Sequence, residues 1–185
     1  MINETYTNIP TAKILLWLSM VSMVMLFAGL TSAYVVRQAE GNWTQFDIPL
    51  PFFISTILII ASSVTMQWAY NAVRNNDLQK LRTGLLITLA LGLGVSITQF
   101  IGWSGLVAQG IYFIGNPSGS FFYVITAFHL AHLAGGILYL IYVSFRSIQN
   151  RYHKDNDLAI ELCSVYWHFL DGLWIYLFVF LYFIR

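Results

Sequence analysis

The longest charge-free stretch of the chain, residues 83–145, most constrains how it can fold. A helix that spans a bilayer needs about 20 mainly apolar residues, so this stretch is long enough for two such helices. Its middle reads QGIYFIGNPSGS, and Gly, Pro, Asn and Ser in a cluster are typical of a turn. We therefore predict two membrane spans, over about 83–107 and about 120–145.

The rest of the chain has the same character. Hydrophobic residues make up 58% of its 185 residues and charged residues only 9%, whereas a soluble domain carries about 25% charged residues. Further spans are expected over about 14–36, 51–73 and 158–184. The start, MINETYTNIPTAK, is polar, and the apolar run after it is too long for the core of a signal peptide and lacks an AxA cleavage site. The first span should therefore stay in the mature protein. We predict an all-α integral membrane bundle of five transmembrane helices, forming one membrane domain over residues 1–185.

Basic residues in the loops predict the orientation of the bundle. Seven lie on one side of the expected membrane, namely Lys13, Arg74, Lys80, Arg82, Arg146, Arg151 and Lys154. The other side has Arg37 and Arg185. Because Lys and Arg are enriched in cytoplasmic loops, the N-terminus is expected in the cytoplasm and the C-terminus in the periplasm.

Charge and cysteine content exclude several classes of function. A net charge of +1 argues against a nucleic-acid partner. Cys163 is the only cysteine, so the chain has no internal disulfide framework, no CxxCH haem attachment and no thiolate metal cluster of its own.

Polar side chains inside the predicted spans are the candidate functional residues. An ionised Asp at the centre of a membrane helix costs roughly 2.5–3.5 kcal/mol, so Asp171 should face the bundle interior. His168 and Glu161 lie on nearly the same stripe of the last span, and His129 and His132 are spaced i, i+3. Ala131 and Gly135 form a small-xxx-small pair that predicts close helix approach. The other candidates are Thr56, Ser63, Gln67, Gln99 and Trp103.

Three interpretations of these groups stay open from the residues alone. They can form an interhelical hydrogen-bond network, or the histidines with Asp171 and Glu161 can bind a metal or haem. They can also form part of a proton or ion path. The first two spans lack ionisable residues, and the third has none beyond its start, which argues against a continuous relay across the membrane. The chain is then a small transporter or a structural subunit of a larger complex.

Four segments, in order along the chain, resemble one family. VYWHFLDGLWIYLFVFLYF resembles the closing helix of subunit III of the haem–copper oxidases, with its WHF(V/L)D…W pattern. SFFYVITAFHLAHLAGG is similar to that family's FFxxTGxHGLHxxxG helix. IPLPFFISTILIIASSVTMQWAYNAV and GLLITLALGLGVSITQFIGW are similar to two further helices of the same subunit. The chain resembles the five-helix form of subunit III, which occurs in bacteria.

The resemblance implies a role in a redox enzyme without a redox centre in this chain. Haem and copper are expected in the partner subunits I and II, with subunit I in direct contact, beside other oxidase subunits and bound phospholipid. The chain would support subunit I stability and sustained proton uptake while the complex reduces oxygen in a bacterial inner membrane. Cytochrome c is the expected electron donor, and quinol is the alternative. His168 and Asp171 match the WHFxD positions, and His129 and His132 match the two histidines of the HGLH motif.

The chain also departs from the family at three positions. Met23 stands where the first shared helix typically has an acidic residue, and Gly102 stands at the acidic position of the QxxEW motif. Ser55 replaces the family's Asn before Thr56. Family roles that depend on the two carboxylates, including carbodiimide modification, therefore do not carry over.

Overall fold

The computed structural model describes residues 10–149, 152 and 157–184. These residues form five long α-helices, which confirms the predicted all-α membrane architecture. The helices are α1 (Thr11–Ala39), α2 (Leu50–Arg74), α3 (Leu78–Ala108), α4 (Pro117–Ile148) and α5 (Leu158–Phe183). Four of the five are longer than the predicted spans because a helix continues past the first charged residue into the polar interface.

Local sequence accounts for the helix ends. The Asn116 side chain accepts a hydrogen bond from the Ser118 backbone N–H at 3.0 Å, and Pro117 opens α4. Asp77 caps α3 by accepting from the Lys80 N–H at 3.1 Å. The Lys80 side chain, hydrogen-bonded to Asp77, holds the pKa of that carboxyl below its usual range. Asn76 has φ +54°, a conformation that Asn tolerates better than most residues, so the chain reverses tightly between α2 and α3.

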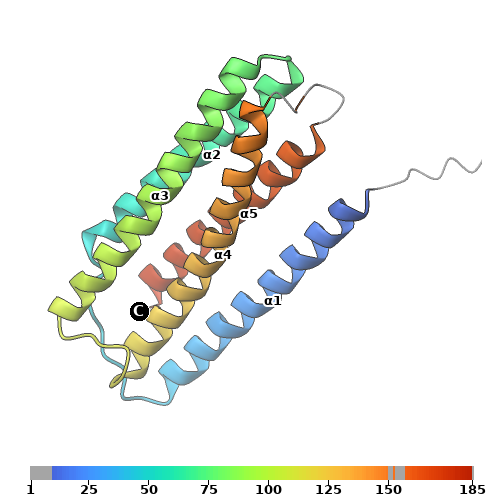
Figure 1. Ribbon diagram of the computed structural model, residues 1–185. Coiled ribbons are helices and arrows are strands. Elements are labelled where there is room, and N and C mark those ends of the chain that lie inside the picture. The colour runs from blue at the N-terminus through green and yellow to red at the C-terminus, as the bar shows by residue number, and fades with distance from the viewer. Residues whose placement is uncertain (1–9, 150–151, 153–156, 185) are drawn as a thin grey trace, which may run out of the picture.

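The helices alternate in direction, with α4 and α5 in the middle of the arrangement (Figure 1). The α2–α3 pair packs on one flank, with α3 against α4 and α2 against α5, and α1 packs on the other flank against α4 and α5. The start of α1, the α2–α3 turn and the end of α4 lie at one end of the bundle. We call it the basic end.

Glycine allows the closest contacts between helices. A Cβ added at Gly84 of α3 would lie 2.8 Å from Cβ of Ala69 on α2. A Cβ at Gly92 would lie 2.8 Å from the ring of Trp167 on α5. The approach predicted at Gly135 is not found, because a Cβ there would meet only the Tyr166 hydroxyl, at 3.9 Å. The close contact falls on Gly136, where a Cβ would lie 3.2 Å from both Leu170 and Tyr166.

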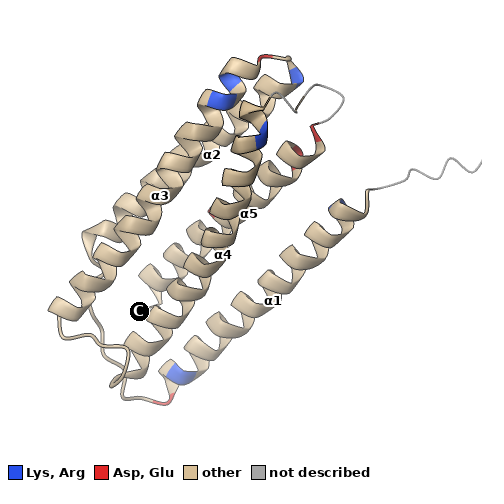
Figure 2. Cartoon of the chain, in the orientation of Figure 1, with Lys and Arg blue, Asp and Glu red and all other residues tan. Residues whose placement is uncertain are grey.

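Apart from Asp171 in the middle of α5, the described charged residues lie toward the ends of the bundle (Figure 2). The described basic residues at the basic end are Lys13, Arg74, Lys80, Arg82 and Arg146. At the opposite end, Arg37 forms an ion pair with Glu40 at 3.0 Å. Arg151, Lys154, Arg185 and residues 1–9, which also entered the sequence argument, lie outside the described residues.

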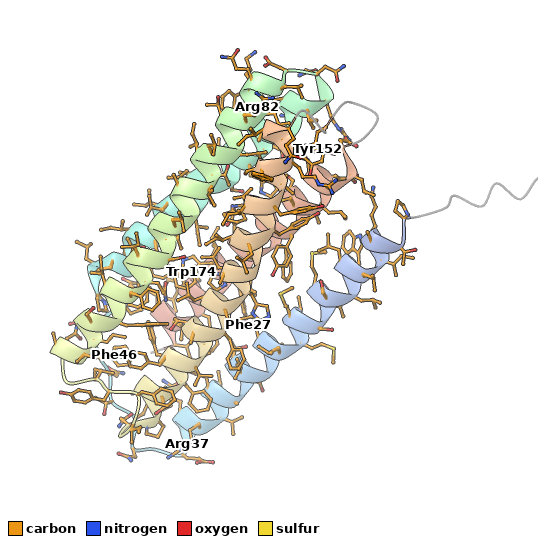
Figure 3. The ribbon with its side chains drawn as sticks, in the orientation of Figure 1. Phe27, Arg37, Phe46, Arg82, Tyr152 and Trp174 are labelled. Atoms are coloured by element: carbon orange, nitrogen blue, oxygen red, sulfur yellow. The ribbon has the colours of Figure 1, made fainter. Side chains whose placement is uncertain are left out.

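One stripe of α1 faces the bundle. Its buried residues recur every three or four positions, as on one face of a helix: Met20, Met23, Phe27, Thr31 and Tyr34. Phe27 points from α1 toward α4, and Trp174 lies in the interior of the bundle (Figure 3). At the far end of α1, the Gln38 side chain donates to the Ile184 carbonyl at 2.8 Å. The helix is therefore fixed along one face and leaves its other faces apolar and exposed.

Candidate functional site

The interior polar side chains link helices in pairs. Three buried or half-buried tryptophan indoles each donate a hydrogen bond to a hydroxyl on another helix. Trp103 donates to Thr126 at 3.0 Å, Trp167 to Ser62 at 3.1 Å, and Trp174 to Thr56 at 3.0 Å. Each bond satisfies a donor that hydrocarbon could not solvate, so the pairs fix both the rotation and the register of the helices.

His168 connects α5 to a polar strip on α2. Its Nδ1 lies 2.6 Å from the Ser63 hydroxyl, and its Nε2 lies 3.2 Å from Oε1 of Gln67. The Gln67 amide in turn donates to Asn71 at 3.1 Å. Ser63 and His168 are half-buried, while Gln67 and Asn71 are exposed on the surface of the described bundle. The polar strip is the row Ser63, Gln67 and Asn71, and it runs toward Arg74 at the basic end.

Asp171 lies one turn farther along α5 and is 3% exposed. Neither of its carboxyl oxygens has a hydrogen-bond partner in the part of the chain that the structure describes. Burial of an ionised carboxylate in such a place is costly, so the neutral acid is the form that the bundle interior favours.

His129 of α4 and Gln99 of α3 are two further buried polar residues. The His129 ring lies 4.9 Å from the Trp174 ring and is 2% exposed. Neither ring nitrogen of His129 has a hydrogen-bond partner in the part of the chain that the structure describes, and the same holds for the Gln99 amide nitrogen. These groups add polarity to the interior without forming a closed network.

Two predicted residues lie elsewhere. His132 places its Nδ1 2.7 Å from the Phe128 carbonyl of its own helix, and its ring lies 5.9 Å from that of Phe27. Glu161 forms an ion pair with Lys13 of α1 at 2.6 Å. The structure thus brings together Ser63, Gln67 and His168, and joins Thr56 to Trp174 of the same helix α5. It separates Glu161 and His132 from that group. Asp171 lies one turn from His168 without a hydrogen bond to a described residue.

The described residues contain no cluster of three or more His, Cys, Asp or Glu side chains that could hold a metal ion. The three intramembrane histidines face different neighbours: a serine on α2, a tryptophan on α5 and a backbone carbonyl on α4. What the arrangement offers is hydrogen bonding between helices.

Several contacting residues were not singled out from the sequence. Ser62 and Thr126 accept the indole hydrogen bonds, and Thr65 lies 2.8 Å from Thr88 across α2 and α3. Trp167 and Trp174, which donate two of those bonds, are each 1% exposed. Their spacing around Asp171, four before and three after, is the helical signal that places all three on one face.

A cavity of about 420 Å³ lies between α1 and the α4–α5 pair, next to the Lys13–Glu161 ion pair. Its lining is mostly apolar: Ala12, Leu15, Leu16, Ser19, Gly135, Tyr139, Leu162 and Tyr166. A second cavity, of about 260 Å³, lies farther along α1 against Leu173 and Tyr176 of α5.

Five long apolar helices with interhelical hydrogen bonds between buried side chains define a multi-pass helical membrane protein. Residues 9–185 match the family model described as cytochrome c oxidase subunit III. The chain belongs to this family.

Curated relatives agree with the family model. A probable cytochrome c oxidase subunit 3 of Nocardia farcinica is 34% identical over 184 residues, covering 96% of this chain and 89% of the relative. The cytochrome c oxidase subunit 3 of Corynebacterium diphtheriae is 32% identical, over 88% of this chain and 82% of its own length. That of Drosophila melanogaster is 31% identical over 76% of this chain and 52% of its own. The similarity extends along nearly the whole bundle.

Proposed function

We propose that the chain is the non-catalytic subunit III of a proton-pumping aerobic terminal oxidase, specifically a cytochrome c oxidase. The observation that carries this proposal is the family match along residues 9–185, which includes all five helices. The relatives named above are cytochrome c oxidase subunits, which favours cytochrome c over quinol as the electron donor. In this proposal haem and copper belong to subunits I and II, and oxygen is reduced there.

The proposed location is a bacterial inner membrane, with the basic end in the cytoplasm. The basic residues described at that end support this orientation, because cytoplasmic loops are enriched in Lys and Arg. The N-terminus is then cytoplasmic and the C-terminus periplasmic. Residues 1–185 would act as a single membrane domain.

The chain would stabilise subunit I by direct contact and would hold phospholipid beside it. The apolar cavities along α1 suit acyl chains, and Lys13 lies at the basic end, where it could meet a lipid phosphate. The sustained proton uptake expected of such a subunit would then depend on the position of α1 and on bound lipid.

The test is affinity purification of the tagged chain from native membranes in mild detergent, followed by mass spectrometry and a haem spectrum. We expect a large haem-bearing subunit I and a subunit II, and a dinuclear-copper motif in subunit II would identify cytochrome c as the donor. Recovery of the chain alone in a folded state would overturn the proposal and favour a small transporter.

Asp171→Leu provides a second test of the role in assembly. Because Asp171 is buried within this chain, the substitution should lower the amount of subunit I recovered, while the recovered complex keeps its haem spectrum. Met25→Leu, at a position 71% exposed on α1, serves as the control and should recover normal amounts. A fully assembled Asp171→Leu complex that has lost its haem signal would contradict a non-catalytic role.

A further inference from the structure

We propose that the outer side of the α2–α5 contact is the surface that docks on a transmembrane helix of subunit I. That helix carries a side chain that hydrogen-bonds with Gln67 and Asn71. The proposal rests on the function proposed above, because subunit I is the partner that it names. We call this surface the α2–α5 seam, and it consists of Ile60, Val64, Gln67 and Asn71 of α2 with His168 and Gly172 of α5.

The α2 part of the seam is one face of that helix. Ile60, Val64, Gln67 and Asn71 follow one another at intervals of three or four residues, so their side chains form a row. All four are exposed on the described bundle, Ile60 at 50% and Val64 at 66%. No described helix of this chain covers the row, although half of it is polar.

The polar half of the row lies at a depth where lipid tails would surround it. Gln67 lies five residues from the middle of the 25-residue α2, about 7.5 Å along the axis, and Asn71 lies nine residues away, about 13.5 Å. The hydrocarbon core of a bilayer is about 30 Å thick, so it extends about 15 Å on each side of its centre. With α2 centred in the membrane, both carboxamides are in the hydrocarbon or at its edge.

The chain itself satisfies only part of these two carboxamides. Oε1 of Gln67 lies 3.2 Å from Nε2 of His168, and the Gln67 amide donates to Asn71 at 3.1 Å. A carboxamide has two N–H donors and two acceptor lone pairs. Among the described residues, Gln67 uses two of these four positions and Asn71 uses one. Lipid tails can fill none of the others, so a polar neighbour is favoured.

His168 extends the same need to the centre of the membrane. It lies between two and three residues from the middle of the 26-residue α5, about 4 Å along the axis. Its side chain is only half-buried. Ionisable side chains in membrane helices almost always face an interior, so a helix that covers the seam would complete the burial of His168.

Gly172 is an independent sign of helix docking. It is exposed one turn after His168, and a Cβ added there would meet no described atom within 4 Å. Glycine weakens a helix relative to alanine, and no close contact within the described bundle requires it here. Small residues are enriched where two membrane helices approach closely. Gly172 thus leaves room for the backbone of a docked helix beside His168.

These features define the chemistry of the partner segment. It must be a helix, because a lipid-exposed loop or sheet edge would leave its backbone unsatisfied in hydrocarbon. It should be apolar where it meets Ile60 and Val64, and it should carry a hydroxyl or carboxamide side chain at the level of Gln67. Such groups both donate and accept hydrogen bonds, as two partly satisfied carboxamides require.

The experiment is photo-cross-linking in native membranes from a benzophenone side chain at Val64, which lies in the seam and packs against no helix core. We expect adducts with a transmembrane helix of subunit I, identified by mass spectrometry of the purified tagged chain. The same probe at Met25 of α1, 71% exposed, is the control and should react mainly with lipid. Adducts at Val64 with lipid alone, or with a second copy of this chain, would overturn the inference.

The haem spectrum of the same preparation distinguishes two failures. If haem-bearing subunit I copurifies but is not cross-linked from Val64, the docking surface lies elsewhere and the proposed function stands. If subunit I does not copurify at all, the proposed function and the inference fail together.

Substitution of Gly172 tests the close approach. Gly172→Leu should lower the recovery of subunit I about fivefold or more, because the larger side chain would hold the docked helix away. Gly29→Leu is the matched control, since Gly29 is exposed on α1 and an added Cβ there also meets no described atom within 4 Å. It should recover normal amounts. Equal recovery with the two variants would contradict docking at Gly172.

Substitution of Gln67 tests the hydrogen bonding. Gln67→Leu should lower the recovery of subunit I about threefold, the size expected for one interhelical hydrogen bond in a membrane. A seam covered only by lipid predicts no loss, because leucine is favoured at a lipid-facing position. Ser104→Leu is the control, as the exposed Ser104 hydroxyl donates only to the Phe100 carbonyl of its own helix.

The amount of tagged chain in the membrane separates weakened docking from failed folding. Where Gln67→Leu accumulates poorly, Gln67→Asn keeps a carboxamide and should accumulate normally, with part of the subunit I recovery restored. Wild-type recovery of subunit I by a normally accumulated Gln67→Leu chain would overturn the proposed hydrogen bonds.

Discussion

Gly102 of α3 lies against the aromatic ring of Phe52 on α2. A Cβ added at Gly102 would lie 2.7 Å from that ring, closer than carbon atoms can pack. The ring of Phe52 therefore fills the space that a side chain at residue 102 would need, and the two residues form a close apolar contact between α2 and α3.

We predict that Gly102→Ala lowers the free energy of unfolding by about 1–3 kcal/mol, the usual cost of overpacking. The measurement is unfolding in mixed micelles followed by circular dichroism. Gly172→Ala is the control, since a Cβ there meets no described atom within 4 Å, and it should be neutral or slightly stabilising. Combining Gly102→Ala with Phe52→Leu should recover part of the loss. An unchanged stability for Gly102→Ala alone would show that α2 and α3 are not in tight contact at this level.

The indole–hydroxyl pairs can be tested one at a time. Thr56 accepts from Trp174 and also donates to the Phe52 carbonyl of its own helix. A double-mutant cycle of Thr56→Val with Trp174→Phe should give a coupling of about 0.6 kcal/mol, and at most about 1.7, as for other interhelical hydrogen bonds in membranes. The same cycle with Thr98→Val should be additive, because the Thr98 hydroxyl donates to carbonyls within α3. A coupling of zero for the Thr56 cycle would contradict the bond.

At the scale of elements, α1 is the helix fixed along a single face. It packs on α4 and α5 through one stripe and is tied at its ends by the Lys13–Glu161 ion pair and the Gln38 bond to Ile184. Met23 belongs to this stripe and to the apolar core. Met23 thus serves helix packing in this chain.

Two methionines on α1 separate packing from lipid contact. Met23 is 7% exposed and Met25 is 71% exposed. Met23→Ala should weaken the docking of α1 by about 2 kcal/mol, near the lower end for a buried Met→Ala change, because lipid tails can fill part of the space. Met25→Ala should have little effect. After protease cleavage of an engineered site in residues 41–49, the α1 fragment should stay with the wild-type bundle and dissociate more readily with Met23→Ala. Equal dissociation for both variants would place the interface elsewhere on α1.

At the scale of the whole molecule, the proposed orientation predicts which loops face which compartment. Asn75 lies in the turn at the basic end and Gln45 lies in the loop at the opposite end, and both are exposed. With a thiol reagent that cannot cross membranes, Gln45→Cys should react in intact cells, whereas Asn75→Cys should react only after the cells are opened. Labelling of the native cysteine should be low, because Cys163 is 1% exposed. Labelling of Asn75→Cys in intact cells would reverse the orientation.

The amount of structure that the sequence predicts differs from helix to helix. The break predicted at QGIYFIGNPSGS was found between α3 and α4, but its last four residues, 117–120, form the first turn of α4, because Pro is favoured at the start of a helix. The helix ends were less well predicted. The spans were bounded by the nearest charged residues, whereas α1 includes both Lys13 and Arg37 and extends two residues beyond each. The Trp167–Ser62 and Trp174–Thr56 pairs could not be predicted, because the partner of a donor depends on the rotation of a second helix.

The sequence by itself determined that this chain crosses a membrane through five helices, and it contains the motifs of its family. A bilayer leaves a long apolar segment no other way to satisfy its backbone, so length and apolar content are sufficient. Only the tertiary structure decided which polar groups meet: Glu161 with Lys13, His168 with Ser63 and Gln67, and the close approach at Gly136. Helical periodicity fixes which residues share a face, whereas the register between two helices is set by side-chain packing across the interface.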